Sequence, residues 1–195
     1  FAQREAADGF PRVVMLDTQF RMHPRLGGFV SQQFYEKAGL GKVHSGRKAE
    51  DFMAQVPGYG EAVCAWKDVP AEAGADERHG TSRRRKPEAK QIACEVQRLL
   101  AVLPSDMSIG VITFYAAQRD CIFEELAGPG FTEKGEGSWR VRPEHAGNGQ
   151  CPERLRIGTV DAFQGKEFDV VLLSVVRSNK LAMGLPDEAD SEEVY

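Results

Sequence analysis

A short cluster near the start of the chain holds residue types that can grip both ends of a nucleotide. In QFRMHP, residues 19–24, Phe20 offers a flat apolar face for a base, and Arg21 offers a charged fork that suits phosphate oxygens. An isolated Phe-Arg pair is more often a core residue beside a surface ion pair. The cluster therefore needs support from its surroundings.

A second cluster, in GTVDAFQGKEFD at residues 158–169, has similar chemistry. Gly165 lacks a side chain, so its backbone N–H can approach an anionic oxygen closely. Gln164 and Glu167 can hydrogen-bond a base, a ribose hydroxyl or water. This is nucleotide chemistry, although one glycine alone is a weak signal.

Apolar runs that predict strands flank both clusters. Residues 13–16 precede the first cluster, and a helix-like segment at residues 26–37 follows it. The second cluster lies between residues 157–160 and residues 170–176. The last run is almost unbroken, as expected of a parallel strand covered on both faces. We expect strand, tight turn and strand here, at a sheet edge where ligands dock.

The middle of the chain alternates between strand and helix patterns. We expect a short strand at residues 62–66, a helix opened by Pro87 and ended by Pro104, a strand at residues 109–113 and a helix at residues 116–126. This alternation predicts an α/β fold with a doubly wound, mostly parallel sheet.

Three motifs, taken in order, carry a family resemblance. QFRMHP, IGVITFYAAQ (residues 109–118) and VDAFQGKEFDVVLLSVVRSN (residues 160–179) resemble the motifs of superfamily 1 helicases, most closely the up-frameshift-like branch of superfamily 1B. In that branch they belong to the second of two RecA-like domains, the C-terminal AAA-type helicase domain. The resemblance implies a RecA-like, P-loop NTPase-type α/β fold with helices on both faces of the sheet.

The resemblance also implies a division of the chain. Residues 1–12 would be an entry segment from a preceding domain, and residues 13–180 the second RecA-like domain, with a loop insertion at about 128–156. Residues 181–195 would be an acidic tail that stops before the family's last motif. The sequence contains no G-x-x-x-x-G-K-[ST] phosphate loop, which in this family lies on the first RecA-like domain.

The resemblance implies one half of an ATP site. Phe20 takes the position of an aromatic residue that stacks on adenine, where the family usually has tyrosine. Arg21 takes that of a catalytic arginine at the γ-phosphate, with Gln19 in support, and Gly165 and Glu167 line the nucleotide cleft. ATP is the implied nucleotide, and the ligands of its Mg²⁺ are expected on the first domain.

The same resemblance implies a nucleic-acid surface. Thr113 and Tyr115, together with Thr159 and Asp161, occupy strand-end motifs that face the nucleic-acid strand in such helicases. Phe114 stands where the family usually has proline, so this turn is expected to differ locally.

The implied function is the C-terminal RecA-like half of an ATP-dependent helicase. It would act on single-stranded DNA or RNA with the N-terminal RecA-like domain of the same polypeptide. A nucleic-acid-dependent ATPase switch that does not unwind, or a nucleic-acid binding module, stays open as an alternative. The sequence does not decide between DNA and RNA.

Composition limits the remaining options. A net charge of −4 and a pI near 5.7 argue against holding nucleic acid by bulk electrostatics, so contacts with a strand must be local. No apolar run approaches the length of a membrane span and no targeting segment is visible, so we expect a cytoplasmic protein without membrane contact. The cysteines are widely spaced, which indicates reduced, mostly buried thiols and no metal site: Cys64, Cys94, Cys121 and Cys151.

Two segments leave a nucleic-acid role open. The glycine-rich residues 128–156 read as a mobile surface insertion, in which Trp139, Arg140 and Arg142 either contact a strand or, as favoured, the tryptophan anchors the loop to its own domain. The basic run at residues 83–86 either tracks phosphates or, more commonly for such runs, is simply solvated.

Overall fold

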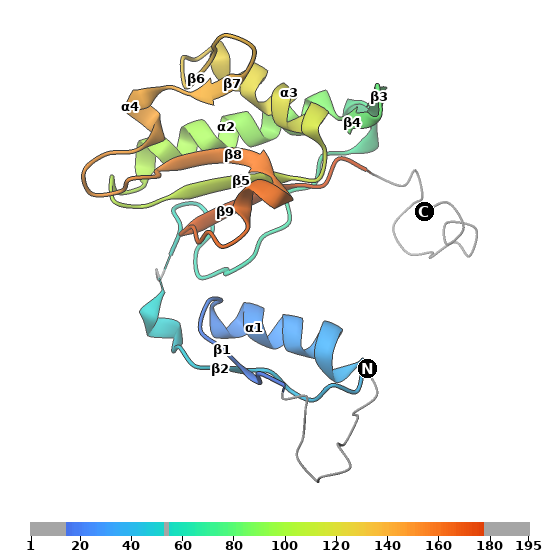
Figure 1. Cartoon of the computed structure of the whole chain (residues 1–195), viewed down its shortest axis with the longest axis vertical. Helices are drawn as coiled ribbons and strands as arrows, with labels where there is room; N and C mark the ends of the chain where they lie inside the picture. The colour runs from blue at the N-terminus through green and yellow to red at the C-terminus, as the bar shows by residue number, and fades with distance from the viewer. Residues whose placement is uncertain (1–14, 53–54, 178–195) are drawn as a thin grey trace, which may run out of the picture. The chain divides into compact units, whose positions relative to one another are not determined.

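The structure, a computed structural model, describes residues 15–52 and 55–177 (Figure 1). Its contacts divide the chain into two units, Phe1–Trp66 and Lys67–Tyr195, and each is described by itself.

Several expected segments fall at the margins of the described residues. The expected entry segment at 1–12 and tail at 181–195 lie outside them, as does the first half of the strand expected at 13–16. The second half of that strand, Met15 and Leu16, is not in a strand.

The first unit holds a short parallel pair of strands beside a helix. β1 (Thr18–Gln19) pairs with β2 (His44–Ser45), and α1 (Pro24–Val30) continues into a wider π-helical segment, η1 (Ser31–Glu36). A 3₁₀ turn, η2 (Ala49–Asp51), follows. The helix expected at residues 26–37 is thereby confirmed.

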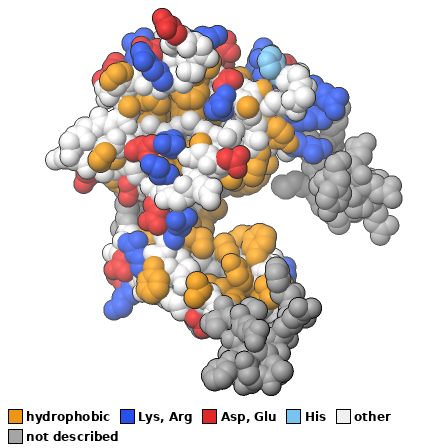
Figure 2. Space-filling model, viewed as in Figure 1, with side chains coloured by type: hydrophobic (Ala, Val, Ile, Leu, Met, Phe, Trp, Pro, Cys, Tyr) orange, Lys and Arg blue, Asp and Glu red, His pale blue; other side chains and the backbone are white. Residues whose placement is uncertain are grey.

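Local chemistry explains where α1 begins. Pro24 stands in the first turn, where its missing N–H removes no helical hydrogen bond. His23 caps the helix, since its Nδ1 accepts the N–H of Arg25 at 3.2 Å. Phe29 and Phe34 remain exposed, and Figure 2 shows hydrophobic side chains gathered over this helix.

The second unit is built on a three-stranded parallel sheet in the order β8-β5-β9. β5 (Ile109–Thr113) lies between β8 (Leu155–Thr159) and β9 (Val170–Ser174). The helices α2 (Lys86–Val102) and α3 (Ala116–Ala127) pack on it. The helices and strands agree with a RecA-like α/β fold, and the parallel sheet expected from the alternating patterns is confirmed.

Both long helices cover the same face of this sheet (Figure 1). Pro87 lies in the first turn of α2, and the helix ends ahead of Pro104, as the sequence predicts. Apolar side chains of the helices and strands meet in a buried core: Val96, Leu99, Ile109, Val111, Ile122, Leu126, Leu155 and Ile157.

The opposite face of the sheet is covered differently. Phe163 and Phe168 lie on Gly110, where a Cβ would come within 2.9 Å of the Phe163 ring. On the same face Val171 and Leu173 are each 51% exposed. The expectation that residues 170–176 form a strand covered on both faces is therefore wrong for the described residues, and the strand ends at Ser174.

The connection between β8 and β9 also differs from the prediction. The two strands are not neighbours, because β5 lies between them. Residues 160–169, which include the 3₁₀ turn η4 (Val160–Phe163), form a crossover rather than a tight turn. Parallel strands cannot be joined by a hairpin turn, so a longer connection is required.

Two small hairpins complete the unit. β3 (Glu77–His79) pairs with β4 (Ser82–Arg84), and β6 (Thr132–Lys134) pairs with β7 (Trp139–Val141), followed by the short helix α4 (Pro143–Ala146). The glycine-rich insertion is thus structured, contrary to the expectation of a mobile loop.

The segment between the units contains no strand at residues 62–66, so that prediction is wrong. Trp66 is 81% exposed there, and a 3₁₀ turn, η3 (Ala71–Ala73), follows. Within the part of the chain that the structure describes, no helix has the length and apolar character needed to cross a membrane.

The cysteines are all free thiols. Cys121 and Cys151 are buried, whereas Cys64 and Cys94 are exposed, so the prediction of mostly buried thiols is correct for only half of them.

Candidate nucleotide and nucleic-acid sites

One side-chain amide shapes the loop after β1. The Oε1 atom of Gln19 accepts the N–H groups of Arg21 at 2.9 Å and Met22 at 2.7 Å. Its Nε2 atom donates to the Met22 carbonyl at 3.0 Å and to Ser45 Oγ at 2.8 Å. Gln19 thus fixes the backbone of residues 19–22.

A glycine in α1 makes room for this arrangement. A Cβ on Gly27 would lie 2.7 Å from Gln19 Nε2 and 2.8 Å from Ser45 Oγ. Any side chain at this buried position would therefore push apart the hydrogen bond that ties the loop to β2.

The loop exposes the two residues expected to contact ATP. Phe20 is 63% exposed, and its ring lies against Gly46, where a Cβ would come within 2.1 Å of Cε1. Arg21 follows it, also exposed. An aromatic face and a guanidinium therefore stand next to each other, on a loop whose shape is set by Gln19.

The second cluster lies in the other unit, on the crossover. Gly165 has a φ of 75° and is open to solvent, a conformation that glycine adopts without strain. Glu167 is exposed two residues later. The crossover therefore offers a bare backbone and a carboxylate.

An ion-pair group anchors this crossover to the sheet. Lys166 Nζ lies 3.0 Å from an oxygen of Glu153, which precedes β8, and Arg156 donates both to Glu153 and to the Ala162 carbonyl. Burial by itself raises the pKa of Glu153, but the hydrogen bonds from Lys166 and Arg156 outweigh it and hold the pKa below its ordinary value. The crossover thus runs back over the sheet toward the amino end of β8.

The carboxyl ends of β5 and β8 bring together the residues expected to face nucleic acid. Thr113 and Thr159 are register partners, Tyr115 precedes α3, and Asp161 is exposed on η4. Thr113, however, is fully buried, and its Oγ1 lies 3.5 Å from the N–H of Tyr115. Its side chain shapes the turn and is not exposed for contact with nucleic acid, contrary to expectation.

Sequence reasoning missed the residue that this turn does expose. Phe114 is 56% exposed between Thr113 and Tyr115, and Val160 is exposed at the adjacent strand end. The signal was present, because an aromatic residue stood where the resembled family has proline. Phe114 is thus an exposed side chain at this edge with a face wide enough to stack on a base.

A buried polar network behind this edge was also missed. Gln118 in α3 is fully buried, and its Oε1 accepts the N–H of Arg85 at 2.7 Å while its Nε2 donates to Ser174 Oγ at 3.0 Å. Gln118 therefore ties α3 both to the start of α2 and to the end of β9.

The basic run at residues 83–86 is largely engaged in structure. Arg83 pairs with Asp76 and Arg84 with Glu77, across and beside the β3–β4 hairpin. Arg85 is buried and donates to three backbone carbonyls: those of Val69, Pro70 and Gly74. Figure 2 shows Lys and Arg side chains gathered over this hairpin, yet most of the run is already paired.

The tryptophan of the insertion anchors it, as favoured from the sequence. Trp139 stacks on Phe123 of α3, with ring centroids 6.3 Å apart and planes 9° apart. Arg140 and Arg142 both pair with Glu133. The hairpin is thus attached to its own unit.

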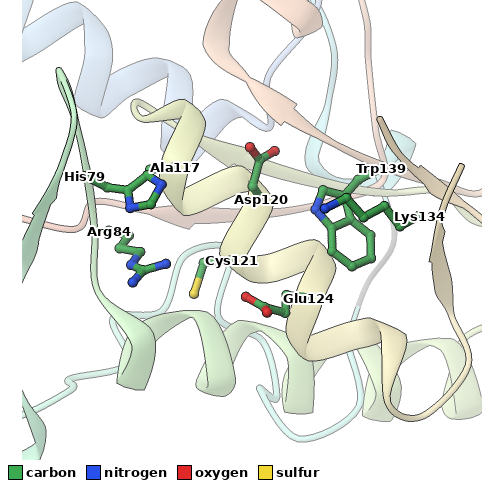
Figure 3. A pocket seen from close by; sticks show the side chains of 8 residues that line it. All are labelled: His79, Arg84, Ala117, Asp120, Cys121, Glu124, Lys134 and Trp139. Atoms are coloured by element: carbon green, nitrogen blue, oxygen red, sulfur yellow. The ribbon is translucent and has the colours of Figure 1, made fainter. Parts of the chain in front are cut away.

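A pocket of about 230 Å³ lies along α3, between the two hairpins (Figure 3). Its polar lining balances two cations against two acids: His79, Arg84, Asp120, Glu124, Lys134 and Trp139. Burial, with Glu125 nearby, raises the pKa of the Cys121 thiol in its wall. A lining with no net charge does not favour phosphate.

No group of three or more His, Cys, Asp or Glu side chains among residues 15–52 and 55–177 is arranged to hold a metal ion. The described residues thus offer no cluster of side chains that could hold a metal ion without a bound nucleotide.

Comparisons with known proteins show the family to which the chain belongs. Residues 3–191 match a family described as AAA domain. A regulator of nonsense transcripts 1 homolog from Neurospora crassa is 32% identical over 170 residues, covering 86% of this chain and 14% of that protein. The ATP-dependent helicase NAM7 from Saccharomyces cerevisiae is 29% identical over 172 residues, 86% of this chain and 16% of that protein. The chain thus spans only about a seventh of such relatives.

Proposed function

Because the chain belongs to the AAA domain family and is a superfamily 1 helicase domain of the up-frameshift-like branch, we propose that it is the second RecA-like half of an ATP-dependent helicase. The nucleic acid on which it acts would be single-stranded DNA or RNA. The observation that carries the proposal is the loop built by Gln19, which exposes Phe20 and Arg21 side by side.

In this proposal the chain supplies one wall of an ATP site. Phe20 stacks on adenine, and Arg21 hydrogen-bonds the γ-phosphate and stabilises the charge that develops on it during transfer to water. Gly165 and Glu167 also contribute to nucleotide binding in this proposal, the glycine through its bare N–H and the glutamate through hydrogen bonds to ribose. The first RecA-like domain supplies the phosphate loop.

Magnesium is the implied cofactor of this reaction, and when bound it neutralises phosphate charge. Its ligands belong to the first domain in this proposal, as the family resemblance implies. The contribution of this chain is to bind and orient the nucleotide.

The strand binds at the carboxyl ends of β5 and β8 in this proposal. Phe114 and Tyr115 contact bases or sugars, and Thr159 and Asp161 offer hydrogen bonds to the backbone or to a 2′-hydroxyl. Thr113 supports the turn from inside. Opening and closing of the ATP site then moves the strand relative to the first domain.

The direct test is Arg21→Ala in the full-length protein. We expect strand-stimulated hydrolysis to fall on the order of 10³-fold, because the γ-phosphate loses its arginine. The dissociation constant for a single strand should change less than about twofold. Arg25→Ala, an exposed arginine on α1, is the matched control and should leave both values unchanged.

Near-normal hydrolysis in Arg21→Ala would refute the assignment of the arginine. Strand displacement from a labelled duplex separates a helicase from an ATPase switch that does not unwind. Parallel assays with single-stranded DNA and RNA identify the nucleic acid.

A further inference from the structure

A strained turn follows β9. Val176 has a φ of 72°, and among the described residues it is the one non-glycine residue with a positive φ. The N–H of Arg177 donates to the Val175 carbonyl at 2.9 Å, which closes a γ-turn around Val176. A β-branched residue rarely adopts this conformation, so surrounding contacts must hold it.

The carboxylate of Glu88 stabilises this backbone conformation. It accepts the N–H of Val176 at 3.1 and 3.2 Å, and it accepts the hydroxyl of Ser174 at 2.8 Å. Glu88 lies in the first turn of α2, and its side chain is largely buried. Arg85 lies 3.9 Å away and balances part of its charge.

A side chain of α3 also fixes the end of β9. Gln118 of α3 donates to the same Ser174 hydroxyl that Glu88 accepts. The end of β9 is therefore fixed by polar groups from both helices, and the exit direction of the chain after it is determined by buried contacts.

The fixed γ-turn places Arg177 at the carboxyl edge of the sheet. Arg177 is exposed directly after the buried Val176. Ser174 is the register partner of Thr113, so the turn lies beside the one that exposes Phe114. Two neighbouring strand ends thus carry an exposed arginine, which suits phosphate, and an exposed aromatic residue, which suits a base.

We propose that Arg177 binds a backbone phosphate of the single strand, and that Glu88 is a positioning residue that holds the γ-turn so that Arg177 faces it. The inference rests on the proposed function and adds a contact to the same surface. Its position favours nucleic acid over ATP. Arg177 follows the carboxyl end of β9, whereas the crossover with Gly165 is anchored through Lys166 toward the amino end of β8.

The salt dependence of single-strand binding tests the contact in the full-length protein. Arg177→Ala should reduce the slope of log Kd against log salt by about 0.7, the value for one lost phosphate contact on a single strand. Arg177→Lys should restore the slope. Arg78→Ala, which removes an exposed arginine from β3, is the matched control and should leave the slope unchanged.

If Glu88 acts by positioning Arg177, the effects of substituting the two residues should not add. Glu88→Ala should lose the same slope as Arg177→Ala, and it should lose nothing further when Arg177 is already alanine. A general loss of structure would instead lower affinity in both backgrounds. If Glu88→Ala does not fold, Glu88→Gln serves, because its amide oxygen can accept only part of the original hydrogen bonds and should give a partial loss.

Three results would overturn the proposal. An unchanged slope in Arg177→Ala, in a protein whose wild type binds single strands and hydrolyses ATP in response, refutes the contact and leaves the proposed function standing. An unchanged slope with a raised KM for ATP assigns the phosphate to the nucleotide instead. A wild type that neither binds strands nor responds to them refutes the proposed function as well.

Discussion

The loop at residues 19–22 in the first unit and the carboxyl edge of the sheet in the second both expose an aromatic residue near an arginine, but they hold them differently. In the loop, one partly exposed amide, Gln19, makes most of the bonds. At the edge, the largely buried Glu88 and the fully buried Gln118 act from two helices. Function at the first region should therefore be separable from stability, whereas at the second the two should be coupled.

A pair of matched substitutions tests this difference most directly. Gln118→Leu leaves the buried N–H of Arg85 without its acceptor, so we expect a loss of about 2–4 kcal/mol in the free energy of unfolding. Gln19→Leu acts on a partly exposed loop and should cost about 1 kcal/mol or less. Denaturant titration measures both, and equal losses would contradict the distinction.

A smaller effect is expected in the loop at residues 19–22, where a substitution should change nucleotide binding while the unit stays folded. In Gly46→Ala the new methyl group meets the Phe20 ring, so we expect the ring to move and the KM for ATP to rise several-fold, while the fold is kept. Gly28→Ala is the control, because a Cβ there meets nothing within 4 Å. A normal KM in Gly46→Ala would argue against adenine stacking on Phe20.

The smallest expected effect concerns pH and the anchor of the crossover. Since the pKa of Glu153 is lowered in the folded state, its stabilisation is present above its ordinary value of 4.5 and is lost as pH falls through the lower folded value. Glu153→Gln should flatten the acid limb of stability as pH falls below 4.5. Unfolding titrations across this range check it, and an unaltered limb would show that the anchor contributes nothing.

How far the sequence reaches can be judged from particular elements. The strand at residues 109–113 is predicted to the residue, and the helices around it nearly so, because apolar periodicity and two prolines mark them. The sequence does not predict the structure of the insertion, because its hairpin is short and polar. The stacking of Trp139 on Phe123 that attaches the hairpin depends on the tertiary fold.

The candidate site divides in the same way. The exposure of Phe20 and Arg21 follows from a local motif, since Gln19 bonds to its own neighbours. The γ-turn at Val176 could not be predicted, because the carboxylate that holds it, Glu88, comes from a distant helix. The burial of Thr113 could not be predicted either, because it depends on how the helices pack on the sheet.

The central place of β5 has a consequence for how the second unit folds. Its strand partners, beginning at Leu155 and Val170, are synthesised long after it, so β5 must wait for both before its backbone groups are paired. The hairpins β3–β4 and β6–β7 close only short loops and can form early. During that delay β5 presents two open edges, and this is the stage at which the nascent chain would be most prone to mispairing.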